Sequence, residues 1–165
     1  MLLSALCQRC GLCCDGNLFS HVPLQRAEVA AARQSGLDVV ELAGGAPALR
    51  QGCPALKGRQ CSVYAERPEG CRRYGCRLYG ALERREISLE EAVAVVEQAH
   101  GLLSAVEAGL GPDPEARPPP VMERARFADL SEDGGLTPEA RAARERAEAF
   151  LDHHFHGGPR RVVGA

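Results

Sequence analysis

The chain has 165 residues, of which 45% are hydrophobic, 4% are aromatic and 25% are charged, and its formal net charge is −2. This length is typical of one domain with a buried core, and the shortage of aromatic residues means that Ala, Leu and Val must fill most of that core. The charge does not favour a polyanion partner. No apolar stretch reaches the roughly 18 residues that a membrane-spanning helix needs.

The two halves of the chain differ in charge. Residues 1–86 contain twelve basic and eight acidic residues, a net +4, whereas residues 87–165 contain eight and fourteen, a net −6. Cysteine sulfurs that ligate a metal carry negative charge, which nearby arginines offset. The basic residues between 57 and 85 could instead contact nucleic acid, but the few aromatic residues do not favour that partner.

The first half alternates cysteine groups with short elements. After the cysteine run at its start, residues 21–36 predict a helix that begins near Pro23 and ends at Gly36. The apolar segment 37–42 predicts a strand, and the Gly- and Pro-bearing residues 43–60 predict a loop. A second cysteine group then leads into a helix, with Tyr74, Leu78 and Leu82 on its inner face.

The second half is predicted to be helical. Ser88 and Glu91 have the spacing of a capping box, and apolar residues recur every three or four positions from there to Leu110. Residues 111–120, GPDPEARPPP, cannot continue that helix and predict a linker. A last helix follows from Thr137 to about Phe155.

These elements predict a mainly α, loop-rich cysteine-cluster domain with packed helices and one short hairpin or strand. We divide it into a cysteine-cluster metal-binding region at 1–86 and a helical segment at 87–165, with a linker at about 111–121. The two segments are expected to pack together as one domain. The start of the chain lacks a basic leader before an apolar stretch, so we expect a cytoplasmic protein.

A cytoplasmic location decides the chemistry of the cysteines, because the cytosol keeps thiols reduced and favours metal binding over disulfides. In the run CQRCGLCC, Cys7, Cys10 and Cys14 share one face if the segment is helical, whereas Cys13 can serve if it is a loop. Successive side chains diverge, so Cys13 and Cys14 are predicted to differ in role.

The spacing leaves the metal open. A C-x2-C-x2-C run favours an iron–sulfur cluster, and Cys53 precedes Pro54 as a remote cluster ligand does in bacterial ferredoxins. Two four-cysteine zinc sites would use all eight thiols, whereas one four-iron cluster would use four. A catalytic thiol beside Arg72 and Arg73 is a further alternative, because nearby positive charge lowers the pKa of a cysteine.

Four motifs occur in order: CQRCGLCC, GCPAL, CSVYAERPEG and the closing pair Cys71 and Cys76. Together they resemble the YkgJ-like CxxCxxCC cysteine-cluster family of zinc- or iron-chelating domains over residues 7–79. The resemblance implies a small metal- or iron–sulfur-binding domain, and some relatives with a similar segment methylate lysines of flagellin. The metal ligands that it implies are Cys7, Cys10, Cys13, Cys14, Cys53, Cys61, Cys71 and Cys76. Supporting roles are implied for Tyr64, Arg67 and Pro68.

The predicted function is therefore the binding of an iron–sulfur cluster, of the 4Fe-4S type for example, or of zinc or iron, for redox or electron transfer. The alternatives are a structural zinc module that binds a protein partner and an enzyme related to protein-lysine methylation. No phosphate loop, dinucleotide fingerprint or HExxH motif is present, so no catalytic residue is assigned. The histidines near residue 154 are expected to be solvated rather than ligands.

Overall fold

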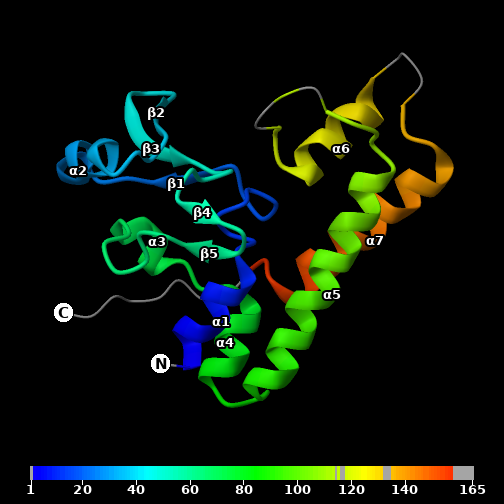
Figure 1. Cartoon of the computed structure of the whole chain (residues 1–165), viewed down its shortest axis with the longest axis horizontal. Helices are drawn as coiled ribbons and strands as arrows, with labels where there is room; N and C mark the ends of the chain where they lie inside the picture. Colours follow the sequence, from blue (N-terminus) through cyan, green and yellow to red (C-terminus); the bar gives the residue numbers. More distant parts are fainter. Residues whose placement is uncertain (1, 114, 116–117, 132–134, 158–165) are drawn as a thin grey trace.

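The structure is a computed structural model that describes residues 2–113, 115, 118–131 and 135–157 (Figure 1). Helices dominate these residues, which confirms the mainly α fold class. The helices are α1 (Leu2–Cys10), α2 (Val29–Gln34), α3 (Glu69–Arg73), α4 (Arg77–Glu83), α5 (Leu89–Ala108), α6 (Val121–Leu130) and α7 (Pro138–His154), with a 3-10 turn η1 (Arg26–Glu28) before α2. None of the helices described combines the length and apolar character that crossing a membrane requires.

Five short strands accompany the helices. They are β1 (His21–Pro23), β2 (Val39–Leu42), β3 (Ala46–Arg50), β4 (Leu56–Lys57) and β5 (Gln60–Cys61). The first three form an antiparallel sheet in the order β1-β3-β2, in which Leu49 pairs with both Val22 and Val39. The last two form a separate hairpin. The strand predicted at residues 37–42 is confirmed by β2.

Two predictions in this region are wrong. The helix expected over residues 21–36 begins later, at η1, because its first residues pair with β3. The loop expected over 43–60 contains β3, the central strand of the sheet. Pro47 in β3 has no N–H to donate, which disfavours a central strand. Its carbonyl nevertheless accepts a hydrogen bond from the N–H of Leu24 at 3.0 Å, a contact between segments distant in sequence.

The helical half follows the predicted pattern closely. The capping box of α5 is formed, with Ser88 Oγ accepting from the N–H of Glu91 and the Glu91 carboxylate accepting from the N–H of Ser88. Thr137 caps α7 through its side chain alone, with Oγ1 accepting a hydrogen bond from the N–H of Ala140 at 3.2 Å. Helix α6 was not predicted, because the prolines before it indicate a linker and it has no capping side chain of its own. The N–H of Met122 instead donates to Asn17 Oδ1 at 3.1 Å.

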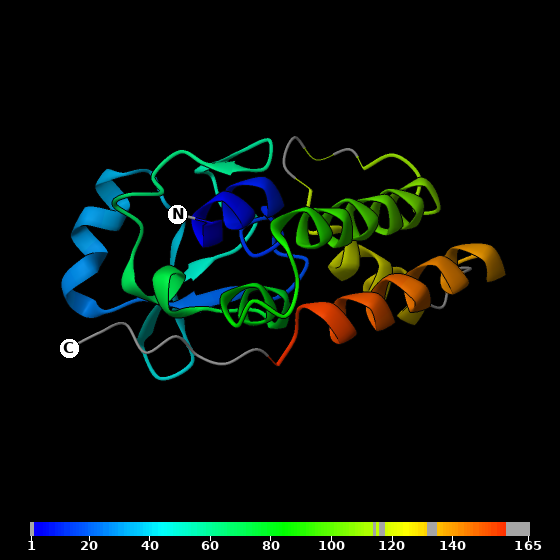
Figure 2. The same cartoon turned by 90° about the horizontal axis from the view of Figure 1, so that it is seen from below.

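The buried side chains form two clusters. The helical core consists of Leu6, Cys10, Leu12, Leu18, Leu78, Leu82, Ala92, Val96, Ala99, Leu103, Val106, Met122, Ala125, Ala143, Ala147, Leu151 and Phe155. The sheet core consists of Val22, Leu24, Ala32, Leu37, Leu49 and Ala55. Figures 1 and 2 show α5, α6 and α7 on one side of the molecule, the sheet with α2 and α3 on the other, and α1 and α4 between them. Several alanines in the helical core allow α5 and α7 to pack closely.

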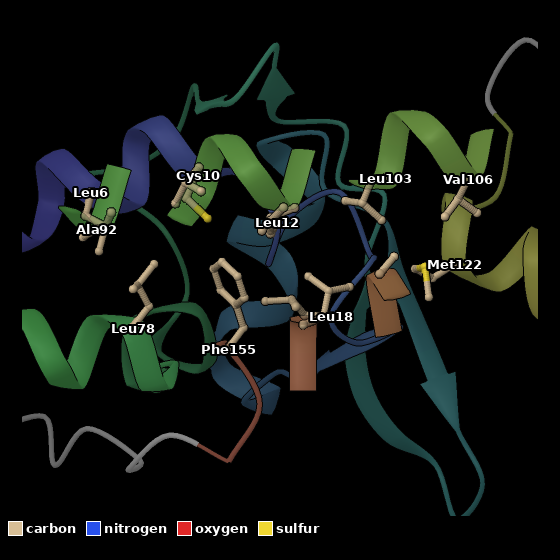
Figure 3. Close-up of a cluster of buried hydrophobic side chains, with 14 of the residues drawn as sticks. Leu6, Cys10, Leu12, Leu18, Leu78, Ala92, Leu103, Val106, Met122 and Phe155 are labelled. Atoms are coloured by element: carbon tan, nitrogen blue, oxygen red, sulfur yellow. The ribbon is translucent and has the colours of Figure 1, made fainter. Parts of the chain in front are cut away.

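The end of α7 returns to the middle of the molecule. Phe155 is completely buried in the helical core, where Figure 3 shows its ring between α4 and the segment that carries Leu12 and Leu18. Its carbonyl accepts hydrogen bonds from the N–H of Arg77 at 3.1 Å and from the Tyr74 hydroxyl at 3.5 Å. The C-terminal helix is thereby attached to the segment that leads from α3 into α4.

This packing predicts that Phe155→Ala lowers the free energy of unfolding by about 3–5 kcal/mol, through lost burial and the cavity left behind. Phe127 supplies the matched control, since its side chain is 75% exposed and Phe127→Ala should change stability by no more than about 0.5 kcal/mol. Urea unfolding followed by circular dichroism measures both. Equal effects of the two variants would contradict the assignment of Phe155 to the core.

Candidate metal centre

All eight cysteines line a single cavity of about 100 Å³. They lie in the described part of the chain, and none of them forms a disulfide. The remaining wall is mostly apolar and includes Leu6, Phe19, Tyr79 and Phe155. The tertiary structure thus brings together the complete set of ligands that the sequence resemblance implies.

The first cysteines are placed by a helix that ends in a sharp turn. Cys7 and Cys10 lie three residues apart on α1 and therefore on the same face. Gly11 ends the helix with a φ of 71°, a conformation that favours glycine, and its carbonyl accepts from the N–H of Cys14 at 2.8 Å. Leu12, which is completely buried, anchors this turn in the helical core.

Cys13 and Cys14 follow that turn and are placed toward different parts of the molecule. Cys13 packs against the helical core. The carbonyl of Cys14 accepts a hydrogen bond of 2.7 Å from the N–H of Cys53, which joins the N-terminal run to the segment after the sheet. The two adjacent cysteines thus have different surroundings, and the predicted difference in their roles stays a prediction.

Cys76 belongs to the side of α1 and α4. It is the N-cap residue of α4, and its sulfur accepts a hydrogen bond from the N–H of Tyr79 at 3.3 Å. Leu78 and Leu82 of α4 are buried in the helical core, as predicted, and Tyr74 packs against it. A backbone N–H directed at sulfur stabilises the thiolate form, which is the form that ligates metals.

Cys53, Cys61 and Cys71 come from the sheet side. Cys61 ends β5 and pairs with Leu56 of β4, and the turn after Cys53 leads directly into that hairpin. Cys71 lies in α3, and both Cys53 and Cys71 pack against the sheet core. The hairpin and the short helix therefore carry these sulfurs to the cavity.

Two residues that the sequence analysis missed hold α3 in place. The Glu28 carboxylate accepts from the N–H of Glu69 at 2.8 Å and from the N–H of Gln25 at 3.1 Å, and so joins α3 to η1. Gly70 lies so close to β1 that a Cβ atom there would be 2.2 Å from the carbonyl oxygen of Pro23. Only the fold reveals such an approach, because nothing in the local sequence distinguishes this glycine from a loop glycine.

From the sequence, Arg67 is expected to donate hydrogen bonds to carbonyls or sulfurs beside the site, but its described contact is with an aromatic ring. Its guanidinium group lies over the Tyr64 ring, 3.9 Å from the ring centre, and its positive charge offsets part of the rise that burial causes in the pKa of Cys71. The hydrogen bonds to nearby carbonyls come from Arg72, which donates to the carbonyls of Arg67 and Ala65. Both Tyr64 and Arg67 line the cavity.

Burial dominates the protonation of the thiols. It raises the pKa of Cys14 and Cys71 to about 12 and that of Cys76 to about 11, with further raising by neighbouring cysteines. The pKa values of Cys10 and Cys13 lie well above the usual range for the same reason. The raised pKa of Cys71 argues against the alternative of an activated nucleophile beside Arg72 and Arg73, because desolvation by burial outweighs the lowering effect of the Arg67 charge.

The thiols do not form a finished site for a single ion. Within the ranges that the structure describes, no group of three or more Cys, His, Asp or Glu side chains has the geometry to hold one metal ion. A tetrahedral zinc site with Zn–S bonds of about 2.3 Å brings its sulfurs to about 3.8 Å from one another. A single ion would therefore draw the thiols inward, whereas a larger group would fill more of the cavity.

Eight thiols around one mostly apolar cavity define a cysteine-rich metal-binding protein. The chain belongs to the CxxCxxCC family, whose description is "Putative zinc- or iron-chelating domain" and whose model matches residues 6–93, more than half of the chain. The resemblance stated from the cysteine motifs is thereby confirmed, and the function at the level of the family is the chelation of zinc or iron. The comparisons with curated proteins and with solved structures find no match.

The close approach at Gly70 predicts that Gly70→Ala displaces α3, destabilises the protein by about 1–3 kcal/mol and weakens metal retention, because Cys71 moves with the helix. Gly101 is the matched control: it is also helical, but a Cβ there would meet nothing within 4 Å. Gly101→Ala should instead stabilise the protein by about 1 kcal/mol and leave its metal content unchanged. Urea unfolding and metal analysis test both, and normal metal retention in Gly70→Ala would refute this positioning role.

The raised pKa values predict that metal affinity increases with pH. The buried thiols of the metal-free protein are protonated at neutral pH, and each one that ligates must release its proton, so affinity should rise about tenfold per pH unit for each ligating thiol. Titration calorimetry with Co²⁺ in buffers of different ionisation enthalpy counts the protons released. Binding without proton release would show that the thiols are not the ligands.

Proposed function

We propose that this protein binds an iron–sulfur cluster through its cysteine thiolates and uses it in redox chemistry or electron transfer. The observation that carries the proposal is the convergence of all eight cysteines on one mostly apolar cavity of about 100 Å³. A cavity that holds one water molecule needs a volume of only about 10–15 Å³. The cavity between the cysteines is therefore larger than a single bare metal ion requires. The C-x2-C-x2-C run supports the same choice, and iron is one of the two metals that the family description names.

The surroundings of the cavity suit a redox group. Cluster potentials depend on hydrogen bonds to the sulfurs, on net charge and on solvent exposure. The chain supplies an N–H donor from Tyr79 to the Cys76 sulfur, positive charge from Arg67 near Cys71, and an apolar wall that limits water. These groups would stabilise the ligating thiolates and tune the potential of a bound cluster.

Ligation would also stabilise the loop-rich half of the chain. The cysteines connect α1, the hairpin, α3 and the start of α4, which have few residues each. A metal bound only by the folded form adds its binding free energy to the stability of the fold. The metal-binding half is thus proposed to depend on its metal for rigidity.

Metal and acid-labile sulfide analysis of protein purified without oxygen tests the proposal. We expect iron and sulfide in equal amounts and a broad visible absorbance that dithionite bleaches and re-oxidation restores. Exclusion of oxygen is essential, since cluster loss in air would imitate a metal-free protein. Stoichiometric zinc without sulfide would contradict the cluster and favour the alternative, a structural zinc module that binds a protein partner.

A further inference from the structure

The eight cysteines are distributed between two parts of the fold. Cys10 is a member of the helical core, and Cys13 and Cys76 pack against that core. Cys53 and Cys71 pack against the sheet core instead. The cavity therefore lies where the two cores meet, with sulfurs arriving from both sides.

The local backbone assigns the remaining cysteines to one side or the other. Cys7 lies three residues before Cys10 on α1 and therefore shares a helix face with this member of the helical core. Cys14 is joined to Cys53 by a backbone hydrogen bond. Cys61 follows Cys53 in the same hairpin segment.

The electrostatic influence between the thiols follows the same division. The cysteines that raise the pKa of Cys14 are Cys61, Cys53 and Cys71. Those that raise the pKa of Cys13 are Cys10, Cys76 and Cys7, together with its chain neighbour Cys14. The division itself stands on the packing of the cysteines against the two cores and on the hydrogen bond between Cys14 and Cys53.

We infer that the chain holds two separate metal centres, each with four cysteine ligands, in place of one shared centre. The helical-side centre has the ligands Cys7, Cys10, Cys13 and Cys76, and the sheet-side centre has the ligands Cys14, Cys53, Cys61 and Cys71. This inference rests on the proposed metal binding but not on whether the metal is an iron–sulfur cluster or zinc. Because no group of three or more of these side chains in the described ranges already has the geometry to hold an ion, binding would draw the four thiols of each centre together. Four thiolates are the full ligand set for a four-iron cluster and for a structural zinc ion alike.

The two centres are neighbours because one peptide bond joins them. Cys13 and Cys14 are consecutive, so their Cα atoms are about 3.8 Å apart while their side chains diverge. This arrangement explains why the motif contains two consecutive cysteines. One turn supplies Cys13 to the helical-side centre and Cys14 to the sheet-side centre. With clusters bound, the arrangement would suit electron transfer between them.

Cadmium NMR of the full chain counts the centres without any substitution. Cd²⁺ binds thiolate sites in place of zinc, and we expect two resonances with shifts typical of four-sulfur ligation. A single four-sulfur resonance at saturation would overturn the division into two centres. Failure of the wild-type protein to bind Cd²⁺, zinc or iron would instead overturn the metal-binding proposal itself, so the two failures are distinguishable.

Paired substitutions then test which thiols belong together. Cys10→Ser with Cys76→Ser should remove one resonance and about half of the bound metal, and Cys53→Ser with Cys71→Ser should remove the other. The matched control is the double variant Cys10→Ser with Cys53→Ser, which has one substitution in each centre. It should weaken metal binding at both centres. Circular dichroism confirms that each variant is folded. Loss of both resonances in either same-side pair, with the fold retained, would contradict the assignment.

Discussion

The structure depends on one backbone turn, at residues 11–14, that directs two consecutive cysteines to opposite sides. Gly11 permits the turn through its positive φ, and buried Leu12 holds it in the helical core. Cys13 then faces the helices, while Cys14 is joined to Cys53 on the sheet side. Without this turn, all the sulfurs of the N-terminal run would lie on the side of the helical core. The run would then no longer be joined to the sheet side through the hydrogen bond between Cys14 and Cys53.

The energetic cost of this cavity is the burial of thiols among apolar side chains. Desolvation raises the pKa of the buried cysteines, so thiolates are unstable there unless positive charge accompanies them. A metal supplies that charge directly. The positive charge of Arg67, which lines the cavity, acts in the same direction on Cys71. Metal binding and folding of the loop-rich half are therefore thermodynamically coupled, because a metal bound only by the folded form adds its binding free energy to the stability of the fold.

The helices of the second half were predictable because their signals are local. The capping box at Ser88 and the Thr137-Pro138 start identify α5 and α7, and apolar residues at helical spacing identify their buried faces. Helix α6 and strand β3 were not predictable, since their support comes from distant residues. Asn17 provides the acceptor at the start of α6, and β3 is defined by pairing with strands on both sides of it despite Pro47.

For the candidate site, the sequence by itself determined the number of thiols and predicted them as the ligands, because sulfur chemistry and motif spacing are properties of the residues. It also indicated that adjacent cysteines must diverge, since backbone geometry requires this of any chain. Only the tertiary structure decided that all eight meet at one cavity and which of them approach one another. Those facts depend on contacts such as the Cys53 to Cys14 hydrogen bond and the approach of Gly70 to Pro23, which join residues separated by tens of positions. Local sequence carries no signal for such contacts, because they are set by how the two cores pack.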